Sequence, residues 1–309
     1  MTLASIVIPS RGGAKRLPTL LAALAAQDDS DWEAIVVIDG DIDDSESVVA
    51  EYAHLPVRSI VFPVNRGRVA ALNAGFEDAK GDVLIRCDDD LVPKPDYVRQ
   101  HKAAVADGGG AIGLYLNVLP ETPYARAYGR QADQLFREGA YAVARDNAWR
   151  YWAGNCSITR ETWDEVGPYD PDYRAYGWED VDYGYRIQQS GRAVRLVPEL
   201  ETTHRVAAVT TKIRVQRAYH SGAARLTFER KHPEAPMAPA APPADSLWNK
   251  LVLAISEHAS RKVLLTAAGA VDLAAQVLPS VISRKLIALL VESAGAAGYA
   301  RPHDTTTEF

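Results

Sequence analysis

The stretch Asp82-Val83-Leu84-Ile85-Arg86-Cys87-Asp88-Asp89-Asp90 places a short apolar run directly before three consecutive carboxylates. An aliphatic run of this length is typical of a buried strand. Carboxylates this close raise one another's pKa, so a bound divalent cation is the economical explanation for the triplet. Oxygen ligands alone favour magnesium, calcium or manganese over zinc. The alternative is a solvated acidic turn, or an aspartate that caps a helix beginning near Pro93-Lys94-Pro95.

The first hundred residues alternate short β-branched runs with helical patterns. This alternation predicts an α/β fold, with a mostly parallel sheet and helices on both of its faces. We expect strands at 5–8, 34–38, 57–62 and 83–86, and helices at 18–26, 45–53 and 69–79. Ligands of such sheets bind at the carboxyl ends of the strands. Asp39, Asn65 and the acidic triplet all fall at such ends.

Composition and charge are those of a globular protein. Hydrophobic residues make up 47% of the 309 residues and charged residues 24%, which are ordinary values. The net charge of −6 argues against a generic nucleic-acid binder. Cys87 and Cys156 form no CxxC or zinc spacing, so a reduced, cytosolic chain accounts for them most simply. We expect no secretion signal, because the strand at 5–8 precedes Lys15-Arg16, and no stretch of about 18 apolar residues to span a bilayer.

A proline-rich segment divides the chain, with five prolines between positions 233 and 245. Such a composition is typical of a linker. We therefore expect a first domain over 1–231, a linker over 232–245 and a helical appendage over 246–309. Apolar faces on the appendage helices need a partner, which is the core, a second subunit in a homodimer or a membrane surface. Arg284 and Lys285 flank one such face, which leaves peripheral attachment to the inner face of the membrane open for a cytoplasmic protein.

Seven separated segments follow one another over residues 3–205. They are Ser5-Ile6-Val7-Ile8-Pro9-Ser10; Val36-Val37-Ile38-Asp39; Asn65-Arg66-Gly67 with Ala71-Leu72-Asn73-Ala74-Gly75; Lys80-Gly81-Asp82; Asp88-Asp89-Asp90; Gly154-Asn155 with Glu165-Val166-Gly167; and Trp178-Glu179-Asp180-Val181-Asp182. Each segment alone is common, but seven in register rarely match by chance. Together they resemble the family 2 glycosyltransferases of the GT-A fold, a Rossmann-like α/β fold.

The resemblance implies an inverting glycosyltransferase that moves a sugar from a nucleoside diphosphate sugar to an acceptor hydroxyl. A UDP-sugar is the favoured donor, with dTDP and GDP open, and the acceptor is a glycan, a lipid-linked sugar or a small molecule. Residues 1–120 would form the nucleotide-sugar half and 121–231 the acceptor half. The implied residues are Asp180 as general base with Glu179 beside it; Pro9, Ser10, Arg11, Asp39, Asn65, Arg68, Asp88 and Asp89 for the nucleotide sugar; Asp90 and His204 for a manganese or magnesium ion; and Trp178, Asn155 and Trp152 for the acceptor.

Several of these residues have a plain structural alternative. Asp39 ends the second expected strand, where its carboxylate can accept the imide N–H of uracil or thymine, but turn residues are common there. Family members often have a second aspartate next, whereas Gly40 stands here and leaves the base open. Gly67 lets the backbone approach a diphosphate, and Arg68 balances its charge.

The metal and base assignments also have alternatives. An isolated histidine such as His204 is commonly a surface or packing residue, whereas a histidine ligand would tilt the metal preference toward manganese. The acids of the segment 178–182 precede a predicted helix, so capping is their alternative role.

Two other classes of protein stay open. Gly12-Gly13 followed by Arg16-Leu17-Pro18 resembles the sugar nucleotidyltransferases, which have a related sheet. The second class is a carbohydrate- or nucleotide-binding protein that keeps the fold without catalysis. Asp90, Asp180 and His204 argue against this second class, because a decayed site usually loses its costly carboxylates.

Overall fold

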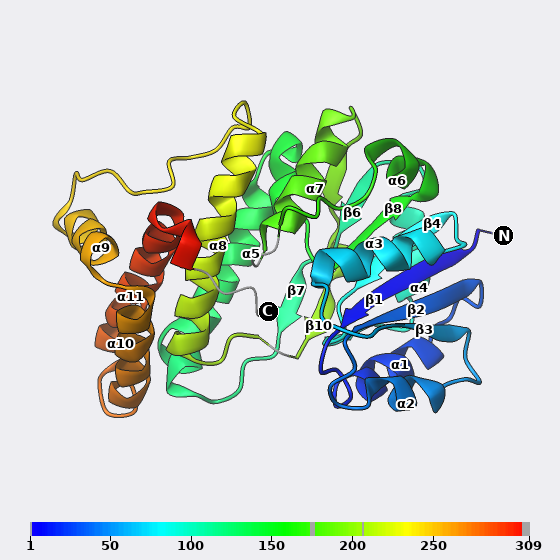
Figure 1. Cartoon of the computed structure of the whole chain (residues 1–309), viewed down its shortest axis with the longest axis horizontal. Helices are drawn as coiled ribbons and strands as arrows, with labels where there is room; N and C mark the ends of the chain where they lie inside the picture. Colours follow the sequence, from blue (N-terminus) through cyan, green and yellow to red (C-terminus); the bar gives the residue numbers. More distant parts are fainter. Residues whose placement is uncertain (1, 174–176, 206, 305–309) are drawn as a thin grey trace. The chain divides into compact units, whose positions relative to one another are not determined.

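The computed structural model describes residues 2–173, 177–205 and 207–304. The chain forms two compact units. Unit 1 contains residues 1–118, 137–172 and 179–205, and unit 2 contains residues 119–136, 173–178 and 206–309. The strands drawn as arrows in Figure 1 belong to unit 1, and the yellow-to-red helices belong to unit 2.

Within the described residues, seven strands of unit 1 form one sheet in the order β3-β2-β1-β4-β8-β6-β9. Their bounds are β1 (Ala4–Ser10), β2 (Trp32–Asp39), β3 (Val57–Phe62), β4 (Val83–Cys87), β6 (Gly110–Ile112), β8 (Asn155–Thr159) and β9 (Val194–Leu196). β1 pairs in parallel with β2 and β4, β2 with β3, and β6 with β9. Only β8 runs antiparallel to its neighbours β4 and β6. The predicted mostly parallel α/β sheet is therefore confirmed.

Helices cover both faces of this sheet (Figure 1). They are α1 (Leu17–Ala25), α2 (Ser45–Ala50), α3 (Arg68–Asp78), α4 (Tyr97–Ala104), α6 (Arg160–Val166) and α7 (Trp178–Gln189). Side chains alternate between the two faces along a strand. Ile6 and Ile8 of β1 join a buried cluster with the leucines of α1 and with Tyr97 of α4. Val7 points the other way and meets α3 so closely that a Cβ on Gly75 would lie 2.3 Å from Val7 Cγ1.

The sequence predicts one strand at 111–118, but the structure has two. β6 ends at Ile112, and β7 belongs to a second sheet with the order β5-β10-β7. The bounds of this sheet are β5 (Leu91–Val92), β7 (Tyr115–Asn117) and β10 (Thr202–His204). The chain changes sheets at Gly113, where a Cβ would lie 2.1 Å from the carbonyl oxygen of Leu200. In the second sheet, His204 aligns with Leu91 on one side and Asn117 on the other.

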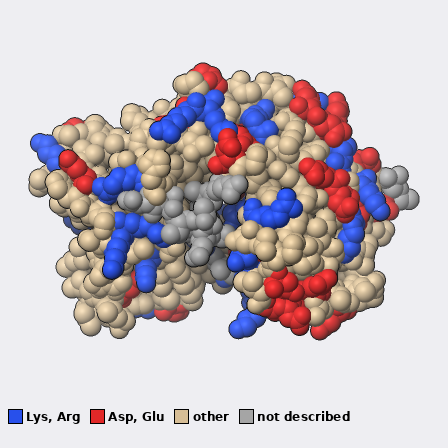
Figure 2. Space-filling model, viewed as in Figure 1, with Lys and Arg blue, Asp and Glu red and all other residues tan. Residues whose placement is uncertain are grey.

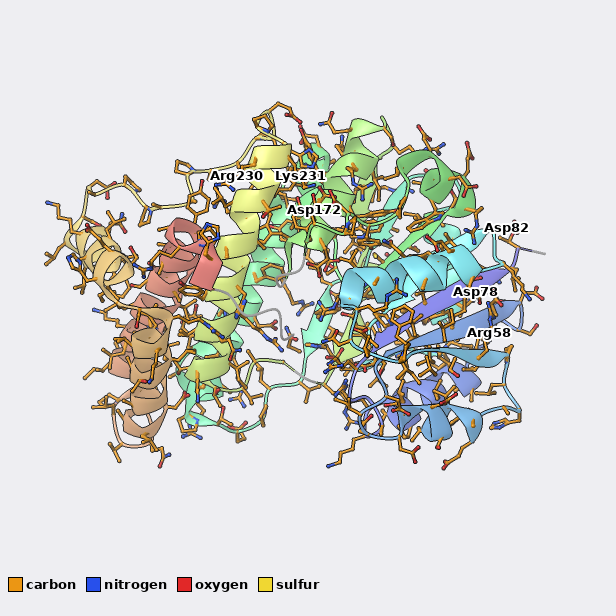
Figure 3. All side chains as sticks on the ribbon, viewed as in Figure 1. Arg58, Asp78, Asp82, Asp172, Arg230 and Lys231 are labelled. Atoms are coloured by element: carbon orange, nitrogen blue, oxygen red, sulfur yellow. The ribbon has the colours of Figure 1, made fainter. Side chains whose placement is uncertain are left out.

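Ion pairs hold the amino ends of the strands, opposite the edge where ligands bind such sheets. Arg58 on β3 donates through Nε to Asp78 Oδ2 at the end of α3, over 2.8 Å (Figure 3). Its Nη1 donates to Glu33 Oε2 on β2 over 2.5 Å. These contacts tie two strands and a helix together, so this end of the sheet serves stability.

Unit 2 is a helix bundle. Its elements are the π-helical turn η1 (Ala125–Gly129), the start of α5 (Arg130–Ala142), α8 (Thr211–Lys231), α9 (Leu247–His258), α10 (Arg261–Ala274) and α11 (Ser280–Ala300). α8 and α11 approach backbone to backbone: a Cβ on Gly298 would lie 1.9 Å from the carbonyl oxygen of Tyr219. Because of this packing α8 clusters with the C-terminal helices, whereas the sequence places it in the first domain.

The remaining connections and helices of unit 2 bear on the predicted appendage. Residues 232–246, all of which the structure describes, contain no helix or strand. Among the described helices, none is both long enough and apolar enough to cross a bilayer. The limits of the appendage therefore stay a prediction. The predicted domains and the two compact units differ in where they place α8: the prediction puts it in the first domain, whereas the compact units put it in unit 2.

Candidate active site

The carboxyl ends of β1, β2, β3 and β4 meet at one edge of the sheet, because these strands are adjacent and parallel. This edge gathers every residue that the sequence assigns to the nucleotide sugar. They are Pro9 and Ser10 at the end of β1, Arg11 after it, Asp39 at the end of β2, Asn65 between β3 and α3, Arg68 at the start of α3, and Asp88 and Asp89 after β4.

Arg86, on β4, is fully buried and links the acidic triplet to α7. Its Nε donates to Asp88 Oδ1 over 3.0 Å, and its Nη1 donates to Asp180 Oδ1. Burial opposes the charge of the guanidinium, but Asp180 and Asp88 raise the pKa of Arg86 well above its usual value. Arg86 is thus a permanent cation between two carboxylates. Sequence reasoning gave it no role, although a charged residue in an apolar strand signals a buried partner.

Asp180 and Glu179 lie in the first turn of α7, and both are buried. Burial raises the pKa of Asp180 to about 7; Arg86 opposes this rise and Glu179 adds to it. Glu179 Oε1 lies 3.5 Å from Arg68 Nη1 on α3. A carboxyl group with a pKa near neutrality can take up a proton at physiological pH, as a general base must.

Asp88 lies among cations. Burial disfavours its charge, but Arg86 and Arg68 hold the pKa of Asp88 below its usual value. Its backbone N–H donates to the carbonyl oxygen of Gly154 over 2.9 Å. A Cβ on Gly154 would lie 2.0 Å from Asp88 Oδ2, so the position requires glycine. Asp88 is therefore ionised and held in one orientation beside the buried arginine.

Asp90 and His204 form a carboxylate–imidazole pair. His204 Nε2 lies 3.0 Å from Asp90 Oδ2, and His204 Nδ1 lies 2.5 Å from Asn117 Oδ1. The imidazole of His204 thus bridges Asn117 on β7 and Asp90 after β4. The second oxygen of Asp90, Oδ1, is buried and bonds to no residue that the structure describes.

The chemistry of this pair fits a divalent metal. One carboxylate and one imidazole are acceptable ligands for manganese, and a substrate diphosphate with water can complete the coordination. Among residues 2–173, 177–205 and 207–304, no group of three or more His, Cys, Asp or Glu is arranged around a common metal position. Asp90 and His204 as metal ligands stay a prediction.

Asp89 makes its contacts inside the protein. Ser10 Oγ donates to Asp89 Oδ2 over 2.6 Å. Arg16 donates to both oxygens, over 2.9 Å from Nε and 2.7 Å from Nη2, and also to the backbone carbonyls of Arg11 and Gly12. Ser10 and Asp89 thus fix the loop after β1. A direct contact of either residue with the nucleotide sugar stays a prediction.

Asp39 holds the loop after β3. Its carboxylate accepts from the backbone N–H of Arg66 over 2.5 Å and of Gly67 over 2.8 Å. Arg11 Nη1 donates to the backbone carbonyl of Asp39 over 2.8 Å. Gly40 has a φ of +76°, and a Cβ there would lie 3.2 Å from Arg11 Nη1, so the glycine found in place of a second aspartate suits this turn.

The three predicted acceptor residues all pack within their own units. Asn155 is fully buried and bonds to Tyr97 and to the carbonyls of Gly113 and Leu200. Trp152 is buried, and its indole N–H donates to Tyr169 over 2.9 Å. In unit 2, the indole N–H of Trp178 donates to Ser221 over 3.0 Å. Asn155 and Trp152 are thus buried in unit 1, and an acceptor-binding role for these residues stays a prediction.

Solved structures with a similar fold define the class. The mannosyltransferase PcManGT from Pyrobaculum calidifontis, in complex with GDP-Man and Mn²⁺, superposes with a TM-score of 0.65 at 19% identity, covering 97% of this chain and 88% of that one. S. aureus TarS 1-349 in complex with UDP-GlcNAc has a TM-score of 0.54 at 13% identity, covering 97% of this chain and 91% of that one. This likeness confirms the expected GT-A fold.

The family follows from the sequence. The model described as glycosyl transferase family 2 matches residues 5–162, so this chain belongs to glycosyltransferase family 2. A second model, described as the N-terminal domain of galactosyltransferase, matches residues 134–212. An undecaprenyl-phosphate 4-deoxy-4-formamido-L-arabinose transferase of Pseudomonas syringae pv. syringae is 30% identical over 187 residues, which are 58% of this chain and 48% of that protein. The chain thus spans about half the length of this relative.

Proposed function

We propose that this chain is an inverting glycosyltransferase that takes a sugar from a nucleoside diphosphate sugar, with UDP-sugars favoured, and passes it to an acceptor hydroxyl. One observation carries the proposal: the buried cation Arg86 bonds both to an ionised Asp88 at the ligand-binding edge and to Asp180, whose pKa is about 7. A donor-facing group and a base are thereby within reach of each other, as group transfer requires. Family membership favours this activity over the nucleotidyltransferase alternative.

The donor would lie along the carboxyl edge of the sheet. Arg68 begins α3, and its side chain is 41% exposed. A guanidinium at a helix N-terminus suits a diphosphate, because both the charge and the helix dipole attract it. Asp39 would accept from the base, since a carboxylate oxygen can receive more than one hydrogen bond.

A manganese or magnesium ion would be held by Asp90 and His204. The buried Oδ1 of Asp90, which has no hydrogen-bond partner among the described residues, and the contact of Asp90 Oδ2 with His204 Nε2 support this assignment. Such an ion supplies charge neutralisation for the diphosphate leaving group. The Mn²⁺ bound by the P. calidifontis mannosyltransferase supports manganese as the first ion to test.

Asp180 would act as the general base. The acceptor oxygen attacks the anomeric carbon on the face opposite the diphosphate, and the anomeric C–O bond breaks with its electron pair leaving on the diphosphate. Asp180 takes the proton of the acceptor hydroxyl in the same process. Arg86 keeps Asp180 in place, and Glu179 lies next to it in the chain. The undecaprenyl phosphate in the name of the P. syringae relative supports lipid-linked molecules as one acceptor class.

A panel of nucleotide sugars tests the proposal. With Mn²⁺ present, at least one UDP-, dTDP- or GDP-sugar should raise the melting temperature of the protein and release its nucleoside diphosphate, because a ligand bound to the native state stabilises it. A panel in which no nucleotide sugar binds contradicts the proposal. Binding without turnover over a broad set of acceptors favours the non-catalytic class instead. Pyrophosphate release from UTP or dTTP plus a sugar phosphate favours the nucleotidyltransferase.

A further inference from the structure

One end of unit 2 exposes an apolar cluster that its own fold does not cover. The end of α10, the turn after it and the start of α11 present Leu273, Val277, Val281 and Ile282, whose exposed fractions are 69%, 85%, 56% and 48%. Ala275 and Ser283, within the stretch 273–283, are buried. The turn is therefore packed on the bundle by its small residues and directs its large aliphatic ones outward. We call these four residues the apolar tip.

Hydrogen bonds bring two further helix ends to the apolar tip. The backbone N–H groups of Thr211 and Lys212, which begin α8, donate to the carboxylate of Asp272 over 2.7 and 3.1 Å. Arg284 Nη1 donates to Gln131 Oε1 on α5 over 2.5 Å. One turn further along α5, on the same face as Gln131, Leu135 is also exposed. The start of α8 and the turn after α10 lie at the same end of unit 2 in Figure 1.

Positive charge surrounds the apolar tip. Lys212, Arg214 and Lys285 are exposed in the adjoining segments, where Asp272 is the only acid within 207–215 and 272–286, and Asp133 lies on α5 between Gln131 and Leu135. The Asp272 carboxylate is used by the N-terminus of α8. Across positions 207–304 there are twelve Lys or Arg and seven Asp or Glu, a net +5 in a chain whose total is −6. Figure 2 shows Lys and Arg side chains on the presented face of unit 2, together with fewer Asp and Glu.

We infer that the apolar tip docks unit 2 on the surface of a bilayer that contains anionic lipids. Exposed aliphatic side chains ringed by cations match the two requirements of such docking, which are burial in the acyl boundary and attraction to acidic headgroups. A second copy of the chain is the less suitable occupant. A two-fold symmetric contact through the tip would place the same lysines and arginines against each other. The inference is independent of the chemistry proposed for unit 1.

Vesicle co-sedimentation of the full chain tests this inference. The protein should pellet with vesicles of phosphatidylcholine and phosphatidylglycerol, more weakly with phosphatidylcholine alone, and less at high salt. Val277→Asp combined with Val281→Asp should weaken binding to the anionic vesicles by about tenfold or more, because both apolar anchors are lost and negative charge is added. Both sites are exposed, and circular dichroism verifies that the variant stays folded.

Leu247→Asp provides the matched control. Leu247 is 86% exposed. The neighbouring Trp248 donates to Glu292 on α11. Glu292 is twelve positions, or about 18 Å, along α11 from Ser280, so Leu247 lies far from the apolar tip. This variant should bind as the unchanged protein does. A second variant, Lys285→Glu, keeps the apolar tip. It should reduce binding to vesicles that contain phosphatidylglycerol and leave binding to pure phosphatidylcholine vesicles unchanged. No sedimentation of the unchanged protein, equal binding by the tip variant, or a dimer in solution that the tip variant disrupts would each overturn the inference.

Discussion

Arg86 controls how the carboxylates of the candidate site behave. A single guanidinium with no exposed surface bonds to Asp88 on its own strand and to Asp180 on α7. The two acids respond differently: the pKa of Asp88 falls below its usual value, whereas that of Asp180 rises to about 7 because burial and Glu179 outweigh the cation. One carboxylate therefore stays charged while the other can exchange a proton near neutral pH.

The first prediction at this scale concerns pH. Asp180 acts as a base only when it is deprotonated, and its pKa is about 7. We expect kcat/KM to be level above about pH 8 and to fall roughly tenfold per pH unit below about pH 6. Steady-state kinetics at saturating metal measure this profile. A rate that stays level down to pH 5 would show that a group with an ordinary carboxylate pKa, or no base at all, governs the step.

The second prediction separates two neighbours of the triplet. Asp90→Asn should lower the Mn²⁺-dependent affinity for UDP at least about tenfold, because it removes a charged ligand. Asp89→Asn should keep that affinity but lower the free energy of unfolding by about 1–3 kcal/mol, because Arg16 loses its charged acceptor. Calorimetric titration with and without EDTA gives the affinity, and urea denaturation gives the stability. Equal UDP affinity with and without EDTA would show that nucleotide binding does not depend on a metal ion.

At the scale of elements, helix α3 depends on close approach to the sheet. A Cβ on Gly75 would lie 2.3 Å from Val7 Cγ1, whereas a Cβ on Gly139, on α5, would meet nothing within 4 Å. Gly75→Ala should therefore cost about 1–3 kcal/mol of stability through overpacking. Gly139→Ala should be neutral or stabilise by up to about 1 kcal/mol, because alanine favours a helix. Urea denaturation of both variants checks this, and equal stability of the two would contradict the packing described here.

Sequence periodicity predicted the early elements well because they alternate in a regular βα pattern. Strand β3 has its predicted bounds, 57–62, and the helices at 18–26 and 69–79 are each shifted by one residue. The division of 111–118 at Gly113 was not foreseen, since it depends on a carbonyl from Leu200 far along the chain. The same limit applies to the site. The run of three aspartates is visible in the sequence as a candidate site. The bond from Arg86 to Asp180 is not, because it joins residues 94 positions apart.

At the scale of the whole molecule, unit 1 has an acidic surplus and is joined to a basic helical unit, unit 2. Residues 207–304 are net positive, although the chain is net negative. Sequence composition predicts that the helical appendage begins after the linker, and this boundary stays a prediction. The glycine-mediated packing of α8 on α11 cannot be seen in the pattern of α8 alone. The proposed transfer chemistry rests entirely on residues of unit 1, all of which the structure describes.

Turnover by Asp180→Asn, compared with the unchanged enzyme at matched donor saturation, tests the central claim most directly. The amide keeps the shape of the side chain but cannot take a proton, so release of the nucleoside diphosphate in the presence of acceptor should fall about 10²- to 10⁴-fold with donor affinity little changed. Asp182→Asn is the control, since Asp182 bonds to Arg186 on the same helix and should affect stability more than rate. Near-full turnover by Asp180→Asn with a saturating acceptor would contradict the account and make Glu179 the leading base.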